Sequence, residues 1–414
     1  MRGQADRDVE SCEGKGEVIA ESRQERPQVS VRPVPLSSLD ESDEMLQSGF
    51  WGHFKQAHGW KAHPFSVAAA AADPAGGTGA TGEAAAPAEG AGPTGEATPG
   101  TGATGNTRVS FGLLVLSRRL FRMFSIAYVP FGPGMDPGEG RGELLASLAR
   151  ALRSHLPRTT LFLRFDLPWQ KSGREPAANG RPRVIKAASD MQPPHTVIVD
   201  IAPPLAQVIA GMKAKTRYNV RLSSKKGVTV GEGSPADLDR WYALYEETSS
   251  RDRIAIHSRA YYRGLFQESR SYPGLKPTVK LLLARHGDEL LAGTIIAFWK
   301  RRAAYLYGAS SGEKRNLMPA YALQWEAIRM AREAGCTSYD LYGVPPRPDP
   351  NHPMFGLYQF KTGFSDCLLE RWGTWDVPFR PMLYALYRTA EAARMFYYRS
   401  LRKRFRKKVR GNDA

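Results

Sequence analysis

The spacing of apolar residues separates the expected strands of this chain from its expected helices. Short runs rich in β-branched and aromatic residues indicate strands, whereas apolar residues three and four positions apart indicate amphipathic helices. In the first half these elements are a helix at 43–60, a strand at 61–67, strands within 108–133, a helix at 140–156 and a strand at 159–167. In the second half they are helices at 237–250 and 258–270, strands within 278–311, a helix at 319–334 and a strand at 338–343.

Both halves therefore show one order: helix, antiparallel strands, loop, helix, strand. This is the order of the GNAT (acyl-CoA N-acyltransferase-like) fold, so we expect an α+β protein with two tandem GNAT-like domains and a C-terminal basic helix. The expected parts are a disordered segment at 1–30, a first domain at 31–212 with a low-complexity insertion at 67–107, a second domain at 213–380 and a basic helix or tail at 381–414.

The insertion has a composition typical of disorder. It consists mainly of Ala, Gly, Thr and Pro with four acidic residues, and it has no aromatic residue, lysine or arginine. Such a segment cannot bury enough apolar surface to offset the entropy lost on ordering. We expect a disordered excursion in a hairpin loop, where extra length costs little free energy.

Positive charge is spread over the chain and concentrated near its C-terminus. The net charge is +17, and ten basic residues against one acidic residue lie between Arg388 and Arg410. This balance favours a polyanionic partner such as RNA, anionic lipid or a phosphate-bearing substrate, although a solvated basic helix without a specific partner is the alternative. The helix expected at 381–401 and the basic run after it suit peripheral contact with an anionic membrane.

The composition also narrows the cellular compartment and the metal chemistry. Three isolated cysteines give neither a disulfide framework nor zinc spacing, which suits a reducing cytoplasm. The N-terminus lacks the apolar core of a signal peptide, and no run approaches about 18 apolar residues. His53, His58 and His63 are five positions apart and do not share a helical face, so we expect no metal site. We expect a cytoplasmic monomer, peripheral at most at the inner face of the plasma membrane.

The loops that would grip coenzyme A in a GNAT enzyme are poorly suited to it. The second-half loop at 310–325 has one glycine, Gly312, and Pro319 removes an N–H donor near the helix start. The first-half loop at 131–145 contains Asp136, Glu139 and Glu143, which repel phosphate. We therefore expect no bound cofactor and an acyl donor other than acetyl-CoA.

One lysine stands inside an aromatic cluster. The segment 354–366 reads MFGLYQFKTGFSD and surrounds Lys361 with Phe, Tyr and Leu residues. Either the lysine stem covers apolar surface while its amine stays in water, or the amine is held in a desolvated pocket to meet negative charge that develops in a reaction. The residues alone favour the first alternative, because long charged side chains are usually exposed.

Several motifs in order resemble the FemABX family of peptidoglycan bridge-forming aminoacyltransferases. They are LQSGFWGHFKQAHGW, YVPFGPGMDP, MKAKTRYNVRLSSKKGV, YDLYG and FGLYQFKTGF. The resemblance covers roughly 46–387 without the insertion. It implies transfer of an amino acid from aminoacyl-tRNA to an amine on the stem peptide of lipid II or of the UDP-linked muropeptide. The segment 237–270 has room for two short helices only, which resembles family members without a helical arm.

The resemblance implies roles for residues that bind the precursor. Lys55 and Arg217 would hold its diphosphate, with Arg221 adjacent, and Tyr305 or Tyr307 would line the same groove. Arginine suits phosphate because its planar fork contacts two oxygens at once. A solvated helix face would equally explain the basic residues, and the tyrosines would then simply pack in a strand.

It also implies roles near the reacting groups. Asp136 would contact the stem peptide near the acceptor amine and accept its proton, although a substrate phosphate is an equal candidate. Phe131 stands where tyrosine is common in the family. Phe360 and Lys361 would lie beside the tRNA 3′ end, and together with the motif order this favours the second alternative for Lys361.

No covalent intermediate is required, because the ester between amino acid and tRNA is already activated. No Ser-His-Asp or Cys-His arrangement stands out, and positioning of amine and ester plus a nearby cation would suffice. Two other functions stay open: a tandem-GNAT acyltransferase acting on a protein N-terminus or an envelope polymer, and a non-catalytic protein that binds RNA or membrane.

Overall fold

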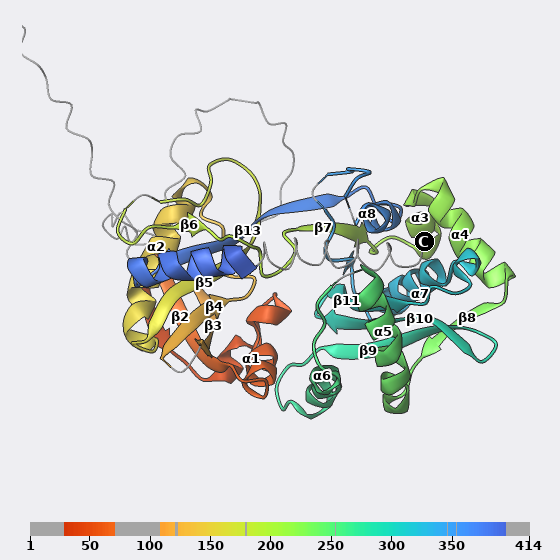
Figure 1. Ribbon diagram of the computed structural model, residues 1–414, viewed down its shortest axis with the longest axis horizontal. Helices are drawn as coiled ribbons and strands as arrows, with labels where there is room; N and C mark the ends of the chain where they lie inside the picture. The colour runs from red at the N-terminus through yellow and green to blue at the C-terminus, as the bar shows by residue number, and fades with distance from the viewer. Residues whose placement is uncertain are drawn as a thin grey trace, which may run out of the picture.

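One mixed sheet runs through both halves of the molecule (Figure 1). The computed structural model describes residues 29–70, 108–120, 123–178, 180–252, 254–345, 347–352 and 354–394. Within them the strand order is β1-β2-β3-β4-β5-β13-β7-β12-β11-β10-β9-β8, and β6 also pairs with β13. The sheet is antiparallel except at the β4–β5 and β11–β12 pairs. The mixed α+β class expected from the sequence is confirmed.

The first half of the sheet is built mainly from the N-terminal part of the chain. Its strands are β1 (Val29–Pro33), β2 (Lys61–Ala70), β3 (Arg108–Leu120), β4 (Phe124–Val129), β5 (Thr160–Gln170) and β6 (Ile185–Lys186). Its helices are α1 (Gly49–Gln56) and α2 (Arg141–Leu152). The expected helix at 43–60 is thus shorter, because Ser48 caps α1 by accepting a hydrogen bond from the Trp51 N–H.

The second half has more helices around its strands. The strands are β7 (His195–Asp200), β8 (Val228–Glu232), β9 (Thr278–His286), β10 (Glu289–Trp299), β11 (Arg302–Ser310), β12 (Ser338–Asp340) and β13 (Leu368–Pro378). The helices are α3 (Leu205–Gly211), α4 (Ala214–Lys225), α5 (Leu238–Asp252), α6 (Arg259–Ser271), α7 (Pro319–Glu333) and α8 (Phe355–Lys361). The two short helices expected within 237–270 are α5 and α6.

The insertion does lie in a hairpin. β2 and β3 pair in register as far as Ala70 and Arg108, so the chain leaves and re-enters the sheet at adjacent positions. Residues 71–107 lie outside the described part, as do residues 1–28, so the two predictions of disorder stay predictions. β2 extends over 67–70, and β1 begins at Val29; each strand therefore takes in a few residues that the predictions had assigned to the insertion or to the N-terminal segment.

Two strands cross between the halves. β13 pairs with β7 through Leu368–Glu370 and then, from Arg371 onward, with β5 of the first half. β7 pairs with β12 and belongs to the second half, although it precedes the predicted boundary at residue 212. The chain therefore changes halves earlier than that boundary, and β13 returns it to the first half.

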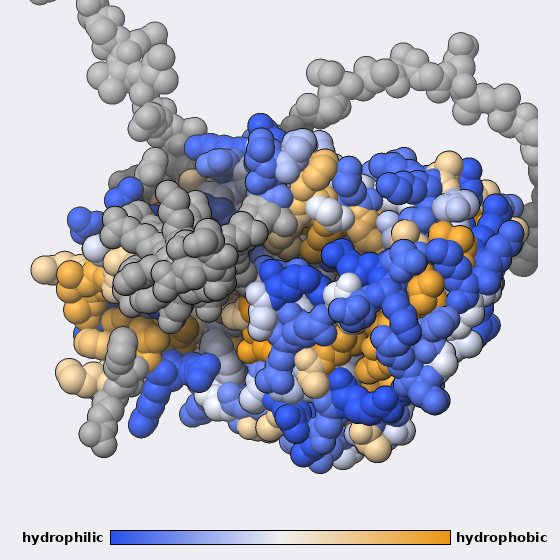
Figure 2. Space-filling model, turned by 45° about the vertical axis from the view of Figure 1, so that its right-hand side comes forward, coloured by the Kyte–Doolittle hydropathy of each residue, from blue (hydrophilic) through white to orange (hydrophobic). Residues whose placement is uncertain are grey.

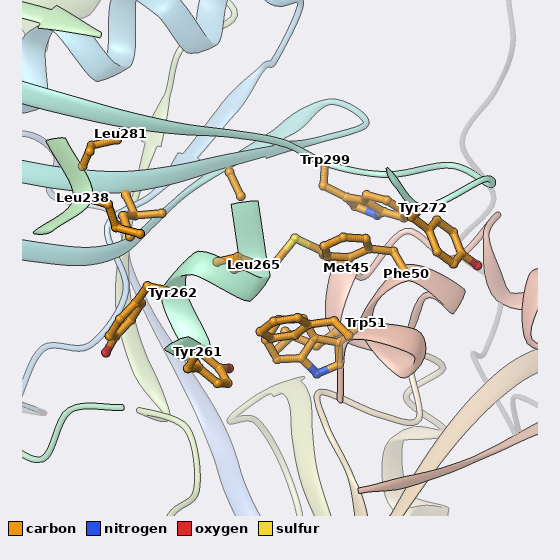
Figure 3. Packing of buried hydrophobic residues seen from close by; sticks show 14 of the residues in the cluster. Met45, Phe50, Trp51, Leu238, Tyr261, Tyr262, Leu265, Tyr272, Leu281 and Trp299 are labelled. Atoms are coloured by element: carbon orange, nitrogen blue, oxygen red, sulfur yellow. The ribbon is translucent and has the colours of Figure 1, made fainter. Parts of the chain in front are cut away.

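The halves share a hydrophobic core (Figure 3). Phe50 of α1 packs edge-on against Tyr272 with ring centroids 5.9 Å apart, and Phe54 packs against Tyr261 of α6 at 4.9 Å. The loop before α1 adds polar contacts, since the Trp299 Nε1–H donates to the Ser42 carbonyl at 3.0 Å. The halves are thus held together by buried apolar area as well as by β13.

A helix at residues 381–394 follows β13 and packs on the first half, where it is the dark blue helix of Figure 1. Tyr384 contacts Phe162 of β5 with ring centroids 5.2 Å apart. The basic continuation of the predicted C-terminal helix lies outside the described residues. None of the helices in the described part is long and apolar enough to cross a membrane.

Candidate active site

Lys361 is the last residue of α8, and its amine is buried. The side chain is 4% exposed, and Nζ donates to the carbonyls of Tyr342 at 2.8 Å and Gly343 at 3.0 Å. Nζ also lies 5.2 Å from the centroid of the Tyr305 ring. Burial lowers the pKa of Lys361 to about 7, while Asp340 acts in the opposite direction. The amine therefore does not reach into water, in contrast to the exposed alternative considered for it from the sequence.

The YDLYG motif supplies the two carbonyl oxygens that accept hydrogen bonds from the Lys361 amine. The Asp340 carboxylate accepts a hydrogen bond from the Tyr342 N–H at 2.7 Å and another from Thr196. Tyr342 has a φ of 51°, a left-handed conformation that ends strand β12 earlier than expected. The turn presents two consecutive carbonyls, those of Tyr342 and Gly343, to the Lys361 amine. Asp340, Tyr342 and Gly343 of the motif thus each have a local structural role.

Phe131 of the first half lies beside the YDLYG motif. The Phe131 ring lies 6.4 Å from the Tyr342 ring, and the Arg371 guanidinium lies 5.1 Å from Phe131. Arg371 Nη2 also lies 3.4 Å from Asp340 Oδ2. Because Arg371 is in β13, where that strand changes halves, the site forms at the junction of the two halves. Sequence reasoning missed Arg371, since only the strand pairing brings it to Asp340.

Two carboxyl groups with unusual acidity lie in the same junction. Burial raises the pKa of Glu44 to about 7, although Arg302, 3.6 Å away, favours its charged form. Burial also raises the pKa of Asp166 to about 7, and that carboxyl accepts hydrogen bonds from Tyr128 at 3.1 Å and Thr374 at 3.0 Å. Nothing in the local sequence distinguishes either residue, because their burial depends on distant segments.

Lys55 lies in a separate aromatic cage. Its Nζ is 5.3 Å from the Trp51 ring, 5.8 Å from Trp60 and 5.3 Å from Tyr261. Burial lowers the pKa of Lys55 to about 8, and the charge of Arg118 lowers it further. No carboxylate lies within ion-pair distance of Lys55 in the part of the chain that the structure describes. The cage unites both halves, because α1 supplies Lys55 and α6 supplies Tyr261.

The two alternative tyrosines of β11 lie in different surroundings. Tyr305 lies beside Lys361, whereas Tyr307 packs against Tyr262, with ring centroids 4.9 Å apart, within the core that adjoins the Lys55 cage. Of the two tyrosines, Tyr305 therefore lies beside Lys361, and Tyr307 lies in the core shared by the two halves.

The structure does not bring Arg217 and Arg221 to Lys55. Both are on α4, at the opposite side of the second half from α1 (Figure 1). Arg217 Nη1 donates to the carbonyls of Ala210, at 3.1 Å, and Met212, which end helix α3. A single diphosphate held by Lys55 and Arg217 together does not fit this arrangement.

Asp136 and Phe360 are engaged elsewhere. The Asp136 carboxylate forms a two-pronged pair with Arg141 at 2.7 and 2.8 Å and accepts the Gly138 N–H at 3.0 Å. Phe360 packs edge-on against Tyr321 of α7 with ring centroids 4.9 Å apart. The hydrogen bonds of the Lys361 amine among the described residues go to Tyr342 and Gly343 instead.

The backbone N–H groups of the loop before α7 donate to acceptors within the chain. The Gly312 N–H donates to the Glu247 carboxylate at 2.8 Å, and the Glu313 N–H donates to the Ser311 hydroxyl at 3.0 Å. These donors are therefore already satisfied by the chain. No cluster of three or more potential metal ligands occurs in the described residues.

The architecture is that of a known class of protein. It matches a solved structure of FemX with a TM-score of 0.63 and 17% sequence identity, over 87% of this chain and all of that one. At this identity the likeness shows the fold alone. The model of the FemAB family matches residues 183–273 and 276–392, and the chain belongs to the FemAB family.

Curated relatives match over shorter stretches. The lipid II:glycine glycyltransferase of Staphylococcus saprophyticus is 24% identical over 253 residues, which cover 47% of this chain and 61% of the relative. That of Staphylococcus aureus (strain USA300) is 34% identical over 113 residues, 27% of each chain. The chain thus spans less than two thirds of the length of these relatives. The family match includes Tyr342, Lys361 and Arg371, whereas Lys55 and Phe131 precede it.

Proposed function

We propose that this protein transfers an amino acid from aminoacyl-tRNA to an amine on the stem peptide of a peptidoglycan precursor, as part of interpeptide bridge formation. The observation that carries the proposal is the buried Lys361 amine at the junction of the halves, within the region that matches the FemAB family. Relatives named lipid II:glycine glycyltransferase support lipid II as the acceptor, and UDP-linked muropeptide carries the same stem peptide.

The reaction needs few groups. The acceptor amine attacks the ester carbonyl carbon, and the carbonyl oxygen gains negative charge. The bond between this carbon and the tRNA 3′ oxygen then breaks, which leaves the amino acid joined to the acceptor by an amide. The ammonium of Lys361 would stabilise the carbonyl oxygen or the departing 3′ oxygen, where a desolvated cation acts more strongly than in water. The proton released by the amine ends on the 3′ hydroxyl of the tRNA.

The carboxyl groups of the junction suit the proton transfer better than Asp136 does. The Asp136 carboxylate already accepts hydrogen bonds from Arg141 through both of its oxygens. Glu44 has a pKa of about 7 and its side chain is 26% exposed, so it can exchange a proton near neutral pH. We place the acceptor amine on the Glu44 side of the site.

Lys55 would hold the phosphates of the precursor. Its amine has three aromatic neighbours and, among the described residues, no carboxylate, so a substrate anion would supply the missing partner. The cage would then fix one end of the acceptor while its stem peptide reaches Lys361.

The test is a transfer assay with defined substrates. The protein is incubated with a mixture of charged tRNAs and either lipid II or UDP-linked muropeptide, and the products are weighed by mass spectrometry. A mass increase of one amino acid on either acceptor supports the proposal. Transfer to a peptide N-terminus, with neither precursor modified, would establish the tandem-GNAT alternative instead. Absence of transfer to any acceptor, with RNA or vesicle binding intact, would favour the non-catalytic alternative.

A further inference from the structure

The exposed face of helix α4 is rich in basic residues. Six lysine and arginine residues and no acidic residue lie between positions 213 and 226. We call its exposed side chains the α4 surface: Lys213, Lys215, Tyr218, Arg221, Lys225 and Lys226. Arg221 and Lys225 are four positions apart and share one side of the helix, where like charges disfavour the helix by a few tenths of a kcal/mol. The spacing of these two cations therefore does not stabilise the helix.

The chain itself neutralises little of this charge. Lys213 lies 3.2 Å from Asp366, and both side chains are exposed. Lys226 donates to the Asn316 carbonyl at 3.3 Å. For Lys215, Arg221 and Lys225, the described part of the chain offers no carboxylate within ion-pair distance. The α4 surface therefore presents free positive charge to a partner.

Aromatic side chains accompany the cations. Tyr218 is 61% exposed and lines a groove of about 400 Å³ together with Arg221 and Lys225. Arg221 and Lys225 also line a second groove of about 520 Å³ together with Trp325 of α7. Cations that follow a backbone beside rings that receive bases are the pattern of nucleic-acid binding.

The α4 surface begins next to the candidate active site. The Lys213 N–H donates to the Gly363 carbonyl at 2.9 Å, two residues after Lys361. Gly363 packs so closely on α4 that a Cβ there would lie 2.2 Å from Thr216 Oγ1. From this contact the helix extends about 18 Å at 1.5 Å per residue. A polyanion whose end is at Lys361 has a basic path along α4.

We propose that the α4 surface binds the phosphate backbone of the acceptor stem of aminoacyl-tRNA, whose 3′ end lies at Lys361. This inference rests on the proposed function and names the surface that holds its donor. The face that carries α4 comes forward in Figure 2, where hydrophilic residues predominate. A membrane is the weaker candidate here, because the exposed apolar residues Met382 and Leu386 lie on the C-terminal helix, whereas α4 offers Tyr218 among its cations.

The experiment measures binding of RNA without any transfer reaction. The full chain is titrated with an uncharged RNA hairpin that has an acceptor-type stem and a single-stranded CCA end, at several salt concentrations. The test variant carries Lys215→Glu and Lys225→Glu. The control carries Arg150→Glu and Arg158→Glu, which reverse two exposed cations on the first half. Vesicles of equal parts phosphatidylglycerol and phosphatidylcholine are tested in parallel.

We expect the test variant to lose roughly tenfold or more in RNA affinity and to reduce the salt slope by about 2, because each lost phosphate contact contributes about 1. The control should change affinity by less than about twofold. Equal effects of both variants, loss of vesicle binding with RNA affinity kept, or no RNA binding by the unaltered protein would each overturn the inference. If the test variant binds RNA normally and the unaltered protein carries out transfer, the inference about the α4 surface is overturned and the proposed function stands. α4-dependent RNA binding without transfer to any acceptor would overturn only the proposed function.

Discussion

At the scale of single residues, Lys361 combines a buried amine with a pKa near neutrality. A lysine amine whose pKa is near 7 exists in both protonation states at neutral pH, so small changes around it shift its charge. The two carbonyls that hold it orient the amine without neutralising it. This is a costly place for a cation in folding terms, and the proposed contact with a substrate would explain why the amine is there.

Replacing this amine should impair turnover more than binding. Lys361→Met is expected to lower turnover by roughly 10²–10³, in the range found when one group that stabilises a developing oxyanion is removed. The matched control is Lys276→Met, since Lys276 also donates to two carbonyls, those of Arg270 and Tyr272, but is exposed. Turnover in single-turnover assays is the measurement. Equal rates for both variants would assign Lys361 to packing alone.

The same residue should make stability depend on pH in a defined direction. Its folded pKa of about 7 lies below its ordinary value of 10.5, so above pH 7 the unfolded chain binds more protons than the folded one. The free energy of unfolding, relative to that of Lys361→Met, should therefore rise with pH between about 7 and 10, by up to about 1.4 kcal/mol per unit. Below pH 7 the difference should be constant.

Urea titrations of both proteins at pH 6.5, 7.5 and 8.5 would check this. A difference that stays constant across these pH values would mean that the amine keeps its proton in the folded protein. The pKa of about 7 for Lys361 would then be wrong.

Sequence reasoning named Lys361, Tyr305 and Phe131 but not Arg371 or Glu44, for a physical reason. Motif order and local pattern identify residues whose neighbours are close in the chain, such as the aromatic residues around Lys361. Arg371 and Glu44 gain their roles from strand pairing and docking between distant segments, which no local pattern records. The family resemblance grouped Arg217 with Lys55, although α4 and α1 lie apart in the structure (Figure 1). The element order was predictable because each element carries its own hydrophobic period.

At the scale of elements, β13 and the following helix are joined to the first half by buried charge. Arg164 of β5 donates to both oxygens of Asp376 in β13, at 2.7 and 2.8 Å, and Tyr384 of the C-terminal helix donates to the same carboxylate at 2.9 Å. Asp376 is fully buried and Arg164 nearly so. A carboxylate in this position depends on its partners, because water cannot replace them.

Removing one partner should therefore destabilise the fold strongly. Arg164→Met is expected to lower the free energy of unfolding by roughly 3 to 5 kcal/mol, the usual cost of leaving one buried charge alone. Arg329→Met is the control, because the pairs of Arg329 with Glu326 and Glu333 are exposed and should contribute about 1 kcal/mol or less. Urea unfolding followed by circular dichroism measures both. Similar small losses would show that Asp376 is satisfied without Arg164.

The β2–β3 hairpin predicts tolerance to shortening. Because Ala70 and Arg108 are paired, a two-residue Asn-Gly turn can join the strands directly. Replacing residues 71–107 in this way should leave the free energy of unfolding within about 1 kcal/mol and turnover within about twofold, since loop closure depends weakly on length. Thermal unfolding and the transfer assay are the measurements. Loss of transfer with unchanged stability would instead reveal a binding role for this segment.

At the scale of the whole molecule, the two halves should unfold together. They share a core that includes Phe50, Tyr272 and Trp299, and β13 is hydrogen-bonded into both. Because of these contacts the two halves form one cooperative folding unit, in contrast to domains joined only by a linker.

A cavity in the shared core tests this directly. Phe50→Ala should lower the free energy of unfolding by roughly 3 to 5 kcal/mol. Hydrogen exchange measured by mass spectrometry should then accelerate in β3 of the first half and β10 of the second by similar factors. Faster exchange in β3 alone would show that the first half opens independently.

The return of β13 to β5 has a consequence for synthesis on the ribosome. Arg164 and Asp376 are 212 positions apart in the sequence, so β5 emerges long before its neighbouring strand exists. At about 5 to 20 residues per second, the delay is roughly 10 to 40 s. Throughout that interval the nascent chain has an unpaired strand edge, the kind of surface that pairs with other chains. Chaperones that shield such edges should therefore matter more for the yield of this protein in the cell than for its stability once released.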